Sequence, residues 1–395
     1  MNCTEESLLS SSSVKFQVQS WHTSDKGIEI DLVSNVTKNL DKFSFPWMWL
    51  RDHCQCSSCF TTTAQRESDI FIEWDRFNWK KVDVETDSAG FLIQWQDDHT
   101  SYFSYQWLEK ILNINNIVSV DDRKYWSNNL PTIDYQSVID TDIGLKYLLE
   151  NLAHFGVCKV IGAEPIKAQA GQLIQRFSYL RQSILGDIFE IKPSSDSNDD
   201  QTHLHTDGTF NYDPPGIKLV QSLETNYVSC EMVFVDGLAV VEKIKNKSPQ
   251  TLNSLQNEIA SYQYITQDIN IIASEPIVIL DENRCLQRIR YNPKLRVPFN
   301  ETDVQKTQVL ETAEKKFKEY IEEEAQKLTI SLSSGEMVLW DNWRVLHGGS
   351  AMNGNHNLAV CIANMEDFHS RLRVIQNKNY QRPIPQPREK KEVAL

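Results

Sequence analysis

The sequence predicts a mainly β protein with flanking helices, in which a small β module precedes a larger jelly-roll domain. Two observations carry this prediction. A chain of 395 residues is too long for one compact core of common size, so two folded units are expected. Short strand-like runs separated by polar turns occur in both parts of the chain, without the regular βαβ alternation of a doubly wound sheet.

The smaller module is predicted for residues 1–125. From about residue 16 to residue 110 few segments are long enough for a helix, and the clearest strand-like runs are DIFIEW, GFLIQW and SYFSYQW. The stretch 115–135 is polar, contains a proline and has no sustained periodicity, which is typical of a linker. We therefore expect the domain boundary near residue 125.

The larger domain is predicted for residues 126–380. Asp142 can cap a helix that Gly156 ends before the strand VCKVIG. Further helices are expected at 167–184, 239–247 and 303–328. The strand-like runs between them are GIKLVQSL, EMVFVDG, EPIVIL and RCLQRIRY. The tail 381–395 is rich in proline and charge, which predicts disorder.

Composition excludes several classes of partner. Forty lysines and arginines stand against 54 acidic residues, a formal net charge of −14, so the chain has no overall basic footprint for nucleic acid. No run approaches the roughly eighteen apolar residues of a membrane span, and the first residues show neither an apolar signal core nor an Arg-rich transit segment. We expect a cytoplasmic protein that binds neither nucleic acid nor membrane.

One candidate metal site combines the motif HLHTDGTF with a distant histidine. His205 and Asp207 are two residues apart, so on a strand their side chains share one face. His347, in LWDNWRVLHGG, can supply a third ligand from a neighbouring strand. Two histidines and one carboxylate leave the opposite positions open, as an oxygen-activating iron(II) centre needs. H-x-D alone is a weak signal, and a histidine satisfied by a backbone hydrogen bond is the alternative for His347 and our interpretation of His203.

A second candidate site is the cysteine cluster in WLRDHCQCSSCF. Cys54, Cys56 and Cys59 supply three thiolates and leave one position of a tetrahedral zinc site to fill. His99 is our choice for the fourth ligand, with His53 as the competitor that is adjacent in sequence. Such a closed site would stabilise the module and not catalyse, whereas the alternative is three reduced free thiols.

Six motifs in order resemble the gamma-butyrobetaine and trimethyllysine dioxygenases of carnitine synthesis. The resemblance runs from about Trp47 to Val374, through WLRDHCQCSSCF, DDHTSYFSYQWL, HTDGTFNYDPPGIKLVQSL, FVDG, WDNWRVLHG and SRLRV. It implies a zinc-binding N-terminal domain and a double-stranded β-helix (jelly-roll) catalytic domain. It also implies Fe(II), with 2-oxoglutarate and O₂ as cosubstrates in the hydroxylation of a small-molecule substrate. Such relatives are often dimers, so a homodimer is one expected state of this protein.

The resemblance also assigns residues. It implies that Cys54, Cys56, Cys59 and His99 bind zinc and that His205, Asp207 and His347 bind iron. Asn292, in RYNPK, and Asn198 lie near positions where the family places asparagines in the active site.

The arginine with which relatives bind the distal carboxylate of 2-oxoglutarate is missing. The segment 348–362 contains no arginine or lysine, and alignment backward from SRLRV puts His356 at its place. An imidazole would hold a carboxylate less well than a guanidinium does, and best when it is charged. Arg288, Arg371 and Arg373 are the other candidates for this contact.

The family holds a trimethylammonium group in a cage of aromatic rings, and this chain departs from that pattern. The cage positions align with Leu185, Phe189 and Ile362, of which one is aromatic. Phe210 and Tyr212 could supply other rings, and the alternative is that they are core or wall residues. The first expectation is a dioxygenase that hydroxylates a gamma-butyrobetaine-like metabolite. The alternatives are an oxygenase with an unrelated substrate and a degenerate metal-binding scaffold that has lost productive 2-oxoglutarate binding.

Overall fold

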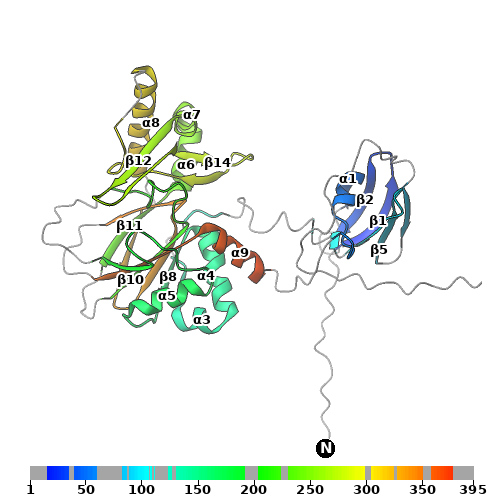
Figure 1. Cartoon of the computed structure of the whole chain (residues 1–395), viewed down its shortest axis with the longest axis horizontal. Helices are drawn as coiled ribbons and strands as arrows, with labels where there is room; N and C mark the ends of the chain where they lie inside the picture. The colour runs from blue at the N-terminus through cyan, green and yellow to red at the C-terminus, as the bar shows by residue number, and fades with distance from the viewer. Residues whose placement is uncertain are drawn as a thin grey trace, which may run out of the picture. The chain divides into compact units, whose positions relative to one another are not determined.

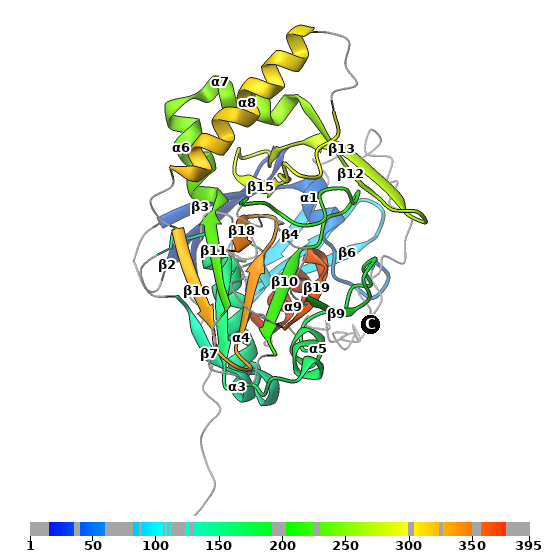
Figure 2. The same cartoon turned by 90° about the vertical axis from the view of Figure 1, so that its left-hand side faces the viewer.

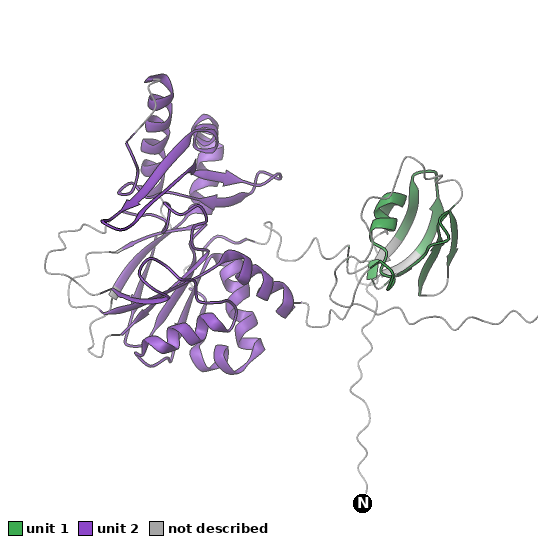
Figure 3. Cartoon of the chain, in the orientation of Figure 1, with its two compact units in different colours: residues 1–117, 379–395 green, residues 118–378 purple. Residues whose placement is uncertain are grey.

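The computed structural model divides the chain into two compact units (Figures 1 and 3). They comprise residues 1–117 with 379–395, and residues 118–378. The structure describes residues 16–34, 40–59, 82–86, 89–105, 107–108, 111, 123–126, 130–191, 203–223, 230–298, 304–323, 327–349 and 357–376. The run DIFIEW and the tail 381–395 lie outside these residues, and the predicted domain limits stay a prediction.

The first unit contains two three-stranded antiparallel sheets and a short helix. The sheets are β1 (Phe16–Thr23), β2 (Gly27–Ser34) and β3 (Leu40–Pro46), and β4 (Asp83–Thr86), β5 (Gly90–Gln94) and β6 (Thr100–Ser104). Helix α1 (Trp47–Asp52) follows β3 directly. Alternate residues of β5, Phe91 and Ile93, are buried against Trp47 and Leu50 of α1. This core fixes the end of α1 beside the turn that precedes β6.

Two facing sheets form the centre of the second unit, and they confirm the predicted jelly roll. The larger has the order β7 (Thr132–Asp134), β8 (Val157–Ile161), β17 (Met337–Asp341), β10 (Ile217–Ser222), β19 (Leu358–Ala363), β9 (Ile188–Ile191). The smaller has the order β16 (Lys327–Leu332), β11 (Cys230–Asp236), β18 (Val345–Gly349). Every pairing in them is antiparallel except β7 with β8. Between the sheets, the Trp340 and Phe234 rings pack edge to face at 5.3 Å.

Helices cover the outer face of the larger sheet (Figure 1). They are α3 (Tyr135–Asp140), α4 (Asp142–Phe155), α5 (Lys167–Gln175) and α9 (Met365–Gln376). Gly156 ends α4 as predicted, with φ of 74°, but Thr141 and not Asp142 is its N-cap, accepting from the Gly144 N–H at 2.9 Å. Among the described residues no helix is long and apolar enough to span a membrane.

Helix α5 is shorter than the predicted 167–184 because tertiary contacts override helical propensity. The Arg181 N–H donates to the Ile362 carbonyl at 3.0 Å, and its guanidinium pairs with Asp213 at 2.9 Å. These contacts hold the segment after Gln175 against the edge of β19, where a continued helix could not form them.

A further layer packs against β11 and β18 through its own hydrophobic core (Figure 2). Its strands are β12 (Ile259–Ile265), β13 (Asn270–Pro276), β14 (Val278–Leu280) and β15 (Leu286–Ile289). Its helices are α6 (Gly237–Lys247), α7 (Pro249–Asn257) and α8 (Val304–Glu322). Helix α7 was not predicted, although Pro249 at its first position is a start signal.

Candidate metal centres

The two histidines of the predicted iron site meet at an isolated β-bridge. His205 lies beside His347 of β18, and the backbone N–H of each donates to the carbonyl of the other, at 3.0 and 2.9 Å. On its other side, the Thr206 N–H donates to the Tyr291 carbonyl at 2.8 Å. These hydrogen bonds hold His205 and Thr206 beside the smaller sheet, and Asp207 begins the turn that follows.

Asp207 lies between the two imidazoles. One of its carboxylate oxygens is 3.1 Å from Nε2 of His347, and the other is 3.7 Å from Nε2 of His205. One ligand atom from each of the three residues lies within 4.8 Å of the others. The remaining ring nitrogen of His205 contacts the His203 carbonyl at 2.9 Å, which orients Nε2 toward Asp207. Two imidazole nitrogens and a carboxylate converging in this way fit a divalent transition-metal ion.

The electrostatics favour the protonation states that a metal requires. Burial lowers the pKa of His347 to about 4, so this imidazole is neutral at pH 7 and keeps a lone pair for a cation. Burial opposes ionisation of Asp207, but the charge of Lys218 and hydrogen bonds from His205 and His347 outweigh it and hold the pKa of the carboxyl well below its usual range. The Trp340 ring, 4.7 Å from that of His347, shields this side of the site from water.

Asn342 fastens the backbone of Asp207. Its side-chain oxygen accepts from the Asp207 N–H at 2.8 Å, and its amide donates to the carbonyls of Asp207 at 3.1 Å and Pro215 at 2.9 Å. Asn342 is 1% exposed, so water cannot replace these contacts. It therefore fixes where the carboxylate stands.

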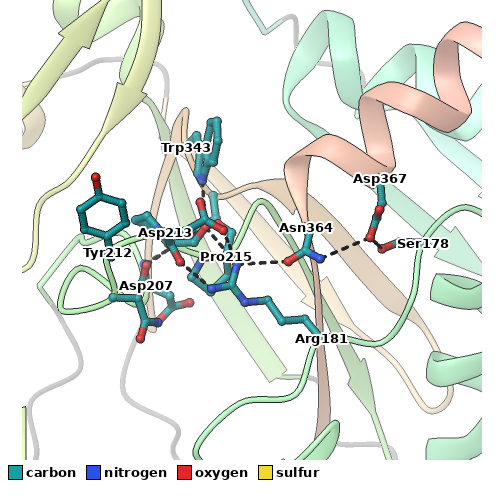
Figure 4. Close-up of polar contacts among 12 residues, drawn as sticks. Ser178, Arg181, Asp207, Tyr212, Asp213, Pro215, Trp343, Asn364 and Asp367 are labelled. Atoms are coloured by element: carbon teal, nitrogen blue, oxygen red, sulfur yellow. Dashed lines mark hydrogen bonds and ion pairs between the residues drawn. The ribbon is translucent and has the colours of Figure 1, made fainter. Parts of the chain in front are cut away.

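Two arginines hold the loop after Asp207. Arg181 pairs with Asp213 at 2.9 Å and donates to the Asn364 side chain at 3.2 Å (Figure 4). From the opposite side the buried Arg290 guanidinium donates to the carbonyls of Thr209, Asn211 and Tyr212. A loop with so many backbone groups engaged forms a rigid wall beside the site.

The Asn342→Ala variant is expected to bind a divalent metal about 10- to 100-fold more weakly, as loss of a group that orients a ligand typically does. Leaving the buried partner groups unpaired should also cost about 1–3 kcal/mol of folding stability. Titration with Mn(II) and thermal unfolding would measure both. Asn151→Ala, on the exposed surface of α4, is the control. Unchanged metal affinity in Asn342→Ala would contradict the positioning role.

The predicted zinc ligands also converge. Nε2 of His99 lies 3.2 Å from the sulfur of Cys54 and 3.5 Å from those of Cys56 and Cys59. One ligand atom from each of the four residues lies within 4.8 Å of the others. Hydrogen bonds from Cys54 and His99 lower the pKa of Cys59 to about 3, so a thiolate forms readily here. Three sulfurs and one imidazole nitrogen at this separation fit a closed tetrahedral site.

The structure distinguishes His99 from its competitor. His53 turns away from the thiols, contacting the Trp49 carbonyl at 2.8 Å and stacking on the Trp49 ring at 3.9 Å. Asp97 accepts from the His99 N–H and pairs with Arg51, each at 3.2 Å. Arg51 in turn approaches the Cys59 sulfur at 3.6 Å. These contacts hold the His99 turn against the cysteine loop.

The predicted cosubstrate residues are only partly described. Asn292, 9% exposed, directly follows Tyr291, whose carbonyl pairs with the H-x-D segment. Its side-chain oxygen accepts from the Lys294 N–H at 3.1 Å, so part of the amide is used within its own turn. Asn198 and His356 lie outside the described residues.

Two of the alternative arginines are already engaged. Arg288 pairs with Glu275 at 2.5 Å and lies over the Trp343 ring, and Arg371 on α9 pairs with Asp142 at 3.5 Å. Arg373, the third, also lies on α9. Helix α9 covers the outer face of the larger sheet, away from the interior where the triad meets.

The positions aligned with the aromatic cage have different environments. Leu185 is 60% exposed, Ile362 is buried in β19, and Phe189 on β9 packs into the core between the sheets. Of the other rings, Phe210 stacks on Tyr264 at 5.0 Å, and Tyr212 is 85% exposed. Of the three positions aligned with the cage, only that of Phe189 carries an aromatic ring.

Lys218 is a residue at the site that the sequence analysis missed. It lies on β10, and its ammonium forms an ion pair with Asp207 and lies 5.3 Å from the centre of the Trp340 ring. All six residues of β10 are buried. A lysine inside such an apolar run, GIKLVQSL, is the signal that could have identified it.

The chain is similar to known proteins over most of its length. Residues 21–109 match the family model "Gamma-butyrobetaine hydroxylase-like, N-terminal". The chain is 24% identical to gamma-butyrobetaine dioxygenase of Homo sapiens over 355 residues, covering 85% of this chain and 92% of that protein. It is 25% identical to mitochondrial trimethyllysine dioxygenase of Mus musculus over 372 residues, covering 90% and 87%.

A solved structure, that of a taurine dioxygenase from Burkholderia xenovorans, matches 61% of this chain and 89% of its own, with 14% identity and a TM-score of 0.47. The model "Taurine catabolism dioxygenase TauD, TfdA family" matches residues 124–361, more than half of the chain and the part that contains His205, Asp207 and His347. By this match the chain belongs to the TauD, TfdA family of 2-oxoglutarate-dependent dioxygenases.

Proposed function

We propose that this dioxygenase uses Fe(II) and 2-oxoglutarate to hydroxylate a small metabolite, with a gamma-butyrobetaine-like compound of carnitine biosynthesis as the first candidate. The observation that carries the proposal is the convergence of His205, Asp207 and His347. Three ligands on one side of an ion leave the other side for an organic chelate and O₂.

His205, Asp207 and His347 would hold the iron. Iron(II) bound there with 2-oxoglutarate and O₂ supplies the oxidising power for hydroxylation of a C–H bond. The chain contributes a neutral His347 and an ionised Asp207 as ligands. The Trp340 ring packs against His347. Asn292, Asn198 and His356 remain candidates for residues at the cosubstrate site.

A gamma-butyrobetaine-like substrate is proposed from the similarity to named relatives. Relatives at 24–25% identity are named for gamma-butyrobetaine and trimethyllysine, both of which carry a trimethylammonium group. The aligned cage positions of this chain supply one ring, Phe189. A different small substrate is therefore the alternative within the same reaction class.

The proposal includes a structural zinc at Cys54, Cys56, Cys59 and His99. It also includes the predicted cytoplasmic compartment and leaves a homodimer open. Cell fractionation and light scattering on the purified protein would test these last two points.

The decisive experiment adds Fe(II) and then 2-oxoglutarate to the protein without oxygen. We expect a visible metal-to-ligand charge-transfer band and, once O₂ is admitted, release of succinate that gamma-butyrobetaine accelerates. Asp207→Ala is the control and should give no band. If the wild type gives neither band nor succinate, the enzyme proposal is wrong and a metal-binding scaffold takes its place. If succinate forms but gamma-butyrobetaine has no effect, the substrate is different.

A further inference from the structure

Lys218 is a buried cation next to the predicted iron ligands. It is 9% exposed, and its ammonium is paired with the carboxylate of Asp207. On the larger sheet it stands between Trp340 of β17 and Ile362 of β19. Its side chain therefore reaches the space between the two sheets, where the triad lies.

Asp207 alone cannot neutralise Lys218 once a metal ion is also bound to it. Asp207 would then share its negative charge with a divalent ion, and the two histidines contribute none. The metal, Asp207 and Lys218 together leave two positive charges in a buried site, and buried charge is unfavourable unless it is compensated. A ligand with two negative charges, such as 2-oxoglutarate, restores neutrality.

Two other buried cations of the described residues pair with carboxylates outside the predicted iron site. Arg344 pairs with Asp236 at 2.7 Å, and Arg290 pairs with Glu275 at 3.1 Å. Among lysine and arginine ion pairs in the described part of the chain, that of Lys218 is the one whose carboxylate belongs to a predicted metal ligand. Lys218 is thus placed to exchange its carboxylate for that of a ligand when the metal binds.

On this basis we propose that Lys218 binds the distal carboxylate of 2-oxoglutarate, the contact for which the sequence analysis selected His356. The inference rests on the proposed function. The near carboxylate and keto group are charge-balanced by the metal, whereas the distal carboxylate enters an interior lined by side chains such as Trp340 and Val360. There it requires a cation, and the flexible stem of lysine lets the ammonium move from Asp207 to this carboxylate.

The test compares two keto acids in the metal-loaded protein. 2-Oxopentanoate has the five-carbon keto-acid chain of 2-oxoglutarate but lacks the distal carboxylate. Wild type should bind 2-oxoglutarate about 10- to 100-fold more tightly than 2-oxopentanoate, as expected of one charge-assisted contact. Lys218→Met should remove most of this preference, weakening 2-oxoglutarate and leaving 2-oxopentanoate nearly unchanged. Calorimetry with Mn(II)-loaded protein measures all four affinities without turnover.

Three further variants serve as controls for this comparison. Lys218→Arg should keep part of the preference, and it serves if Lys218→Met does not fold. Lys159→Met, which removes a lysine paired with Glu336 in the same sheet, should retain the wild-type preference. His356→Ala tests the residue that the sequence analysis selected for this contact.

The inference is overturned if Lys218→Met keeps the full preference, or if it weakens Mn(II) itself and both keto acids equally, since Lys218 would then only position Asp207. Loss of the preference in His356→Ala, with Lys218→Met unaffected, would assign the contact to His356. If wild type binds Mn(II) but neither keto acid, the proposed function fails, and that outcome is distinct from the others.

Discussion

The His347→Ala variant is expected to lose iron(II), and with it all detectable turnover of 2-oxoglutarate. His347 is 4% exposed and neutral at pH 7, so it is a preorganised nitrogen ligand that water does not easily replace. Groups that merely orient a ligand typically contribute 10- to 100-fold in metal affinity, so loss of the ligand should cost at least about a hundredfold. His205→Ala and Asp207→Ala should behave alike. Metal analysis and succinate release measure the effect.

His203→Ala is the matched control for the triad. His203 contacts His205 through its backbone carbonyl, which alanine retains, and its side chain is exposed. Iron content and turnover should therefore stay close to wild type. If any one triad variant retained full iron content and activity, the assignment of that residue as a ligand would be wrong.

The second large effect is expected in the N-terminal unit. Purified protein should contain about one zinc per chain, independent of added iron. Cys56→Ser should lose this zinc and the folded state of the first unit. Structural zinc sites contribute on the order of 10 kcal/mol in small domains, which is comparable with the whole stability of a typical domain. Zinc analysis and circular dichroism during heating would measure the loss.

Two control variants make the zinc experiment specific. Cys285→Ser removes a thiol outside the cluster and should leave zinc content and unfolding unchanged. His99→Ala should lower zinc content, whereas His53→Ala should keep it and lose only the stacking on Trp49. Wild-type zinc content in Cys56→Ser, or loss in His53→Ala alone, would show that the assigned ligand set is wrong.

Much of the fold could be predicted because local patterns and tertiary structure agree. Gly156 ends α4 because a left-handed residue is needed there and glycine adopts it at little cost. The predicted helix 167–184 failed at its C-terminal half because Arg181 binds Asp213 and the edge of β19, contacts that no local pattern reveals. Helix α7 was missed because it is short and amphipathic over few turns.

The sequence by itself determined the residue types and spacings of both candidate metal centres. Alternation on a strand places His205 and Asp207 on one face, and C-x-C-x2-C brings three sulfurs within one loop, because these geometries are local. Only the tertiary structure decided what meets across long separations. It placed His347 beside His205, His99 and not His53 beside the three cysteines, and the lysine of β10 beside Asp207. Strand order and packing set these distances, and both depend on the whole core and not on neighbouring residues.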